Sequence, residues 1–93
     1  MDINLSFGKA LKLIRKKRGL TQEDFSDVSS RTYMSTLERG MKSITLEKLE
    51  DIAGVLGVHP ITILLMTYSE VGEDIQSKEL LNRLVRELAV VKA

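Results

Sequence analysis

Apolar residues recur along the 93-residue chain at the three- and four-residue spacing that marks one face of a helix. The clearest case lies between Ser6 and Arg18, where one face carries Phe7, Ala10, Leu11 and Ile14. The pattern predicts six helical segments, at about residues 6–18, 21–29, 31–39, 46–56, 60–67 and 77–91, and no strand. Gly19, Gly40 and Gly57 stand where three of them should stop. The expected fold class is therefore all-α.

A polar, acidic stretch at residues 68–77 separates the last segment from the other five. We therefore expect residues 1–67 to form a five-helix bundle, and residues 68–93 to supply a linker and one further helix. That helix carries a stripe of Leu81, Leu84, Val85 and Leu88. The stripe either packs on the bundle or pairs with the same stripe of a second chain. We favour pairing, which makes these four residues the expected dimerisation surface.

Composition excludes most kinds of catalytic site. The chain has no cysteine and one histidine, His59, whose place before Pro60 indicates a helix cap. It has no glycine-rich phosphate loop after a strand. We expect no enzyme activity, no cofactor and no metal. No apolar run is long enough for a membrane span, and the start lacks the pattern of a signal peptide, so we expect a cytoplasmic protein.

The net charge of +1 is distributed unevenly. Residues 1–20 hold six basic side chains against Asp2 alone, whereas the remaining residues hold eight basic and twelve acidic ones. Taken by itself, this distribution favours a solvated helix face over a polyanionic partner. The segment from Leu20 to Gly40 favours the partner, because two short helices with a tight turn are suited to placing one helix in the DNA major groove.

The same segment carries a family resemblance. Two runs resemble the Xre-type helix-turn-helix family, which includes phage Cro and repressor proteins. They are Leu20-Thr21-Gln22-Glu23-Asp24-Phe25 and Arg31-Thr32-Tyr33-Met34-Ser35-Thr36-Leu37-Glu38-Arg39-Gly40. Thr45-Leu46-Glu47-Lys48-Leu49 and Leu56-Gly57-Val58-His59-Pro60 continue the pattern, so the resemblance covers about residues 7–65. The second run looks closest to the controller regulators of restriction–modification systems. The resemblance implies a lambda-repressor-like five-helix DNA-binding bundle.

The resemblance also implies roles for individual residues. Arg31, Thr32 and Thr36 fall on base-reading positions, although Arg31 is nearly as well suited to hold a phosphate, and the threonines to allow close approach. Tyr33 either packs on the core or contacts a phosphate. Arg15 and Glu38 match a buried pair between the first and third helices. The expected phosphate contacts are Gln22, Ser30, Tyr33, Arg39, Lys42 and Ser43.

One departure from the family pattern concerns the turn. About two residues, including a glycine, are missing between the second and third helices, where only Val28-Ser29-Ser30 stand. A shorter turn changes the placement of the third helix more than it changes the function. We expect a dimeric repressor that reads an inverted repeat in double-stranded DNA through residues 31–39. The alternatives are an antitoxin on the same body, or an adaptor that binds protein on the same fold.

Overall fold

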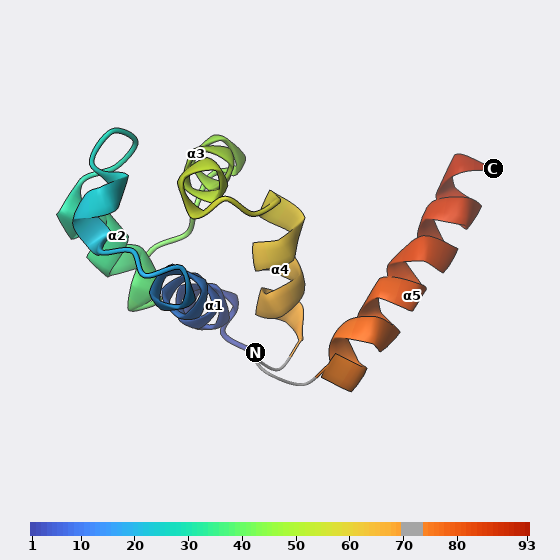
Figure 1. Ribbon diagram of the computed structural model, residues 1–93. Coiled ribbons are helices and arrows are strands. Elements are labelled where there is room, and N and C mark those ends of the chain that lie inside the picture. Colours follow the sequence, from blue (N-terminus) through green and yellow to red (C-terminus); the bar gives the residue numbers. More distant parts are fainter. Residues whose placement is uncertain (70–73) are drawn as a thin grey trace.

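The computed structural model describes residues 1–69 and 74–93, and these residues form five α-helices and one short 3-10 helix, with no strand (Figure 1). The elements are α1 (Ile3–Lys17), η1 (Gln22–Phe25), α2 (Arg31–Glu38), α3 (Leu46–Leu56), α4 (Pro60–Tyr68) and α5 (Asp74–Lys92). The all-α prediction is confirmed. The predicted connection at 68–77 is too long, because α4 includes Tyr68 and α5 begins at Asp74. The rest of that connection, residues 70–73, lies outside the described residues.

The core lies between α1 and the helices that pack on it, chiefly α4 and α2. Its fully buried side chains include Leu11, Phe25, Met34, Leu37, Ile52, Leu56 and Ile63. Two apolar residues of the predicted segments 46–56 and 60–67, at the spacing of a buried helix face, are exposed instead. Leu46 is 79% exposed at the first position of α3, and Ile61 is 56% exposed on α4. The buried side of α4 is formed by Ile63 and Thr67.

Helix α1 begins earlier than predicted. Asp2, and not Ser6, caps it, by accepting a hydrogen bond from the backbone N–H of Leu5 at 3.1 Å. Gly8 lies inside this helix and is buried. A Cβ atom there would lie 2.5 Å from the carbonyl oxygen of Leu37, so the absence of a side chain lets α1 approach the end of α2.

The second helix is shorter than predicted. It is a single turn, η1, that ends at Phe25 and not near Ser29. The carbonyl of Phe25 accepts from the N–H groups of both Val28 and Ser29, at 3.0 and 2.8 Å, and residues 26–28 continue as turns and not as a regular helix. Five residues, 26–30, therefore connect η1 to α2.

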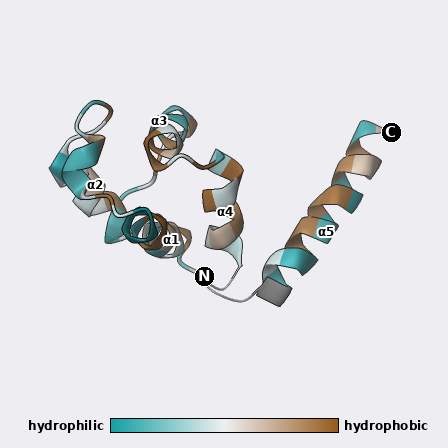
Figure 2. Ribbon diagram, viewed as in Figure 1, coloured by the Kyte–Doolittle hydropathy of each residue, from teal (hydrophilic) through white to brown (hydrophobic). Residues whose placement is uncertain are grey.

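Helix α5 lies alongside α4 and apart from the other helices (Figure 1). Leu80 and Leu84 line an apolar groove of about 400 Å³ between the two helices, opposite Ile61, Leu65 and Tyr68 of α4. Leu81, Val85 and Leu88 are 50–60% exposed. The hydropathy colouring shows polar and apolar residues alternating along α5 (Figure 2). Within the described residues, α5 therefore leaves most of its stripe uncovered.

Candidate nucleic-acid interface

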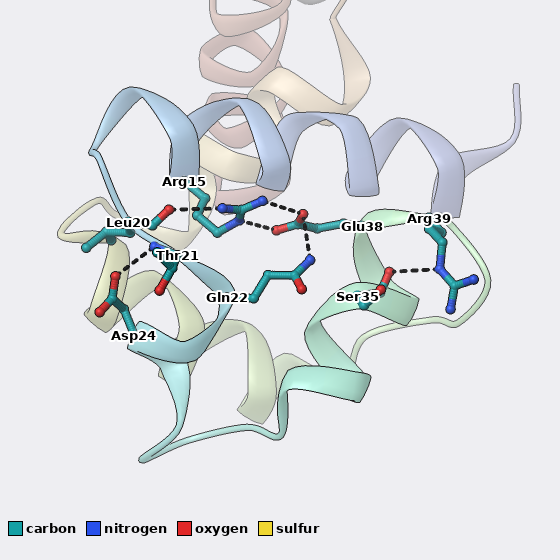
Figure 3. A network of polar contacts seen from close by, with 8 residues as sticks. All are labelled: Arg15, Leu20, Thr21, Gln22, Asp24, Ser35, Glu38 and Arg39. Atoms are coloured by element: carbon teal, nitrogen blue, oxygen red, sulfur yellow. Dashed lines mark hydrogen bonds and ion pairs between the residues drawn. The ribbon is translucent and has the colours of Figure 1, made fainter.

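A buried ion pair fixes α2 against α1 (Figure 3). The Nε and Nη2 atoms of Arg15 donate to the two carboxylate oxygens of Glu38 at 2.6 and 2.9 Å, and Nη1 donates to the carbonyl of Leu20 at 2.9 Å. Both residues are 8% exposed. The hydrogen bonds to Glu38, together with its charge, raise the pKa of Arg15 against the opposing effect of burial. The pairing that the family resemblance implied is confirmed.

Gln22 joins this pair from the start of η1. Its Nε2 atom donates to Glu38 at 3.2 Å, and a side-chain amide has a second N–H on that nitrogen (Figure 3). The backbone beside it is capped, since the carboxylate of Asp24 accepts from the N–H of Thr21 at 2.7 Å. Asp24 thus takes the place in a capping box with Thr21 that Glu or Gln usually occupies. Gln22 is half-buried, so part of its side chain stays open to solvent while its amide contacts Glu38.

The predicted base-reading residues lie on the outer side of α2. Arg31 and Thr32 are exposed, and Thr36 is half-exposed. The Nη1 atom of Arg31 lies 3.4 Å from the carboxylate of Glu23, in an ion pair open to solvent. The hydroxyl of Thr36 donates to the carbonyl of Thr32 at 2.8 Å. The inner side of the helix is occupied by Met34, Leu37 and Glu38, so the two sides of α2 have separate tasks.

The predicted phosphate contacts lie at both ends of α2. Ser30 caps the helix by accepting from the N–H of Tyr33 at 3.0 Å. Tyr33 is half-buried against the core, and the ammonium of Lys42 lies 5.4 Å from its ring centroid. Arg39 donates to the carbonyl of Ser35 at 3.4 Å (Figure 3). The hydroxyl of Ser43 donates to the side-chain oxygen of Asn4 at 3.3 Å. Arg39, Lys42 and Ser43 are all exposed.

One residue of this region was not predicted from the sequence. Lys48, in the first turn of α3, donates a hydrogen bond from its ammonium to the carbonyl of Val28 in the shortened turn. The same ammonium lies 5.7 Å from the centroid of the Tyr33 ring. The sequence held one signal: a lysine in the first turn of a helix is unfavourable against the helix dipole.

Comparison with known proteins decides the family. A model described as helix-turn-helix matches residues 11–63, which include α2 and the residues around it. The chain belongs to the helix-turn-helix family. It is 38% identical over 81 residues to the control protein C.MunI of a Mycoplasma species, across 83% of this chain and 97% of that protein. It is 35% identical to the control protein C.BamHI of Bacillus amyloliquefaciens, across 83% and 96% of the two chains.

A phage protein and a solved structure agree with this assignment. The immunity repressor of Bacillus phage phi105 is 35% identical over 77 residues, which are 81% of this chain and 49% of the repressor. The crystal structure of the clp gene regulator ClgR from Corynebacterium glutamicum superimposes with a TM-score of 0.68 at 25% identity, across 96% of this chain and 88% of that one. The Xre-type resemblance and the helical bundle are thus confirmed.

Membership of the helix-turn-helix family makes this chain a DNA-binding transcription regulator and not an enzyme. No single helix within residues 1–69 and 74–93 has the length and apolar character of a membrane span, although α3 and α4 have them jointly across a bend of 104°. Across the same ranges, His, Asp and Glu side chains form no group of three or more that would hold a metal ion.

Proposed function

We propose that this helix-turn-helix protein is a dimeric repressor that reads an inverted repeat, with α2 of each copy in the major groove. The observation that carries the proposal is the division of α2 into two sides. Its inner side is held by the core and by Glu38, while Arg31, Thr32 and Thr36 stand on the outer side. In this arrangement Arg31 can donate two hydrogen bonds to a guanine edge, and the threonine methyl groups can contact thymine.

The grip on the DNA backbone comes from both ends of α2. Phosphates near the start of α2 accept hydrogen bonds from the second N–H of Gln22 and the hydroxyl of Ser30. Phosphates near the end of α2 are contacted by Arg39, Lys42 and Ser43. Such contacts release counterions, so binding weakens as salt rises. Base contacts then supply the choice of sequence.

Pairing of two copies through α5 supplies the second half-site. The uncovered stripe of Leu81, Val85 and Leu88 continues into the groove between α4 and α5, where Leu84 already lies. A second copy would cover this apolar surface, which costs free energy when left in water. Two half-sites would then lie about one helical turn, roughly 34–36 Å, apart. The relatives named control protein and immunity repressor support a role in controlling transcription of particular genes.

The test is a selection of bound sites from random duplex DNA, followed by titration of the selected duplex at several salt concentrations. We expect an inverted repeat to be enriched, and the enrichment to disappear when Arg31 and Thr32 are both changed to alanine. Enrichment of a single half-site would refute the dimeric reading but leave the DNA-binding role. No enrichment, with weak binding at low salt only, would refute the proposal and favour an adaptor that binds protein.

A further inference from the structure

The turn before α2 depends on a side chain from another helix. In residues 26–30, the carbonyl of Val28 receives no backbone N–H from any residue within 1–69 or 74–93. Val28 is half-buried and packs against the core, so this carbonyl needs a donor. The ammonium of Lys48, from α3, supplies it.

Lys48 occupies a position where a positive charge is electrostatically unfavourable. It follows the cap residue Thr45 by three positions, and Thr45 accepts from its backbone N–H at 3.1 Å. A cation in the first turn of a helix opposes the positive end of the helix dipole. The side chain is nevertheless half-buried, with its ammonium between the turn and the ring of Tyr33.

These contacts join three elements at one charged group. Lys48 belongs to α3, Val28 to the turn, and Tyr33 to the first turn of α2. Arg31 and Thr32 lie between Val28 and Tyr33 in the chain. Because the Lys48 ammonium contacts Val28 on one side and Tyr33 on the other, it fixes the backbone from which Arg31 and Thr32 project.

We propose that Lys48 is a positioning residue for base recognition, which fixes the start of α2 through the turn and through Tyr33 without itself contacting DNA. The inference rests on the proposed function, because it concerns how α2 is aimed at base edges. It gives the charge of Lys48 a use inside the protein, whereas the proposed function gives the exposed Lys42 a phosphate contact. Lys42 is the natural comparison, because its ammonium lies 5.4 Å from the centroid of the same ring while the residue itself is exposed in the loop after α2.

The experiment compares Lys48→Met with Lys42→Met, because methionine keeps an apolar stem and removes the charge and the donor. Each variant is titrated with the duplex selected by the unaltered protein, and with a shuffled duplex of the same composition, over a range of salt. For Lys48→Met we expect the preference for the selected duplex to fall by about tenfold, the discrimination of one bidentate base contact, with an unchanged salt slope. For Lys42→Met we expect the slope to fall by about one and the preference to remain.

Two further variants separate positioning from general stability. Lys48→Arg keeps a cationic donor and should restore the preference. The Nδ1 atom of His59 caps α4 by accepting from the backbone N–H of Ile61 at 3.0 Å. His59→Ala removes this cap and should lower stability without changing the preference for the selected duplex. Amide hydrogen exchange of residues 29–34, measured without DNA, should be faster in Lys48→Met than in His59→Ala at matched stability.

The outcomes are distinct. An unchanged preference in Lys48→Met, or a salt slope lowered as in Lys42→Met, would overturn the positioning role and leave the proposed function intact. A loss of preference in His59→Ala as large as in Lys48→Met would also overturn it, because stability alone would then account for the effect. If the unaltered protein selects no duplex at all, the proposed function fails and the inference fails with it.

Discussion

Removal of the Arg15 guanidinium leaves a carboxylate buried with little to compensate its charge. The side chain of Glu38 is 4% exposed, and after Arg15→Ala only the Gln22 amide, at 3.2 Å, remains as its hydrogen-bond donor. Breaking a buried ion pair from one side costs about 3–5 kcal/mol. The carbonyl of Leu20 also loses its donor, which adds about 1 kcal/mol. We expect the free energy of unfolding to fall by at least about 3 kcal/mol.

Thermal and urea unfolding followed by far-ultraviolet circular dichroism would measure this loss. For a chain of this length, 1 kcal/mol corresponds to roughly 4–8 °C in Tm, so we expect a fall of at least roughly 12 °C. Protein concentration must be the same for every variant, because a dimer gains apparent stability by mass action.

The matched control replaces both partners by apolar side chains, in the double variant Arg15→Met with Glu38→Leu. Because two charges are then no longer desolvated, its stability should lie near that of the unaltered protein, well above that of Arg15→Ala. A double-mutant cycle that includes the single variants Arg15→Met and Glu38→Leu gives the coupling between the two residues. A midpoint for Arg15→Ala that hardly moves, or a double variant that loses as much as the two single changes together, would refute this reasoning.

Three further predictions concern packing, assembly and recognition. Gly8→Ala should lower the free energy of unfolding by about 1–3 kcal/mol, because its Cβ would lie 2.5 Å from the carbonyl oxygen of Leu37. Gly54→Ala, whose Cβ would have nothing within 4 Å, should raise it by about 0.5–1 kcal/mol. Equal shifts in the urea midpoint would contradict this. Val85→Glu should dissociate the dimer in sedimentation velocity while Leu46→Glu, on α3, should not; a dimer that survives Val85→Glu argues against pairing through α5. Thr36→Val should keep the preferred duplex and Thr36→Ser should weaken it, since the hydroxyl already bonds to the carbonyl of Thr32; the reverse order in a competition titration would assign recognition to the hydroxyl.

The fold was largely predictable where helices have one apolar and one polar side. In α1, the spacing of Phe7, Leu11 and Ile14 identified the buried face, which the structure confirms. Helix α4 is apolar nearly all round, so its spacing did not distinguish the buried Ile63 from the exposed Ile61. The second helix is also shorter than the sequence pattern predicts, because the residues after Phe25 form turns that the spacing of apolar residues does not report.

The site was predictable only where the order of residues along one helix determines it. The alternation of Met34 and Leu37 with Arg31 and Thr36 places the last two outside. The pairing of Arg15 with Glu38, 23 residues apart, came from the family resemblance, since no local spacing reports a contact between helices. The contact of Lys48 with Val28, 20 residues apart, had no such precedent and required the folded chain.

The division of α2 into two sides also bears on how such a protein changes over evolutionary time. Each of the outer residues Arg31, Thr32 and Thr36 can be exchanged without opening the core or breaking the Arg15–Glu38 pair. Under the proposed function, a lineage can therefore acquire a new operator by substitutions that leave folding untouched. Two copies of the gene in one cell can diverge in the sites they recognise while sharing one scaffold, and their regulatory circuits then become independent.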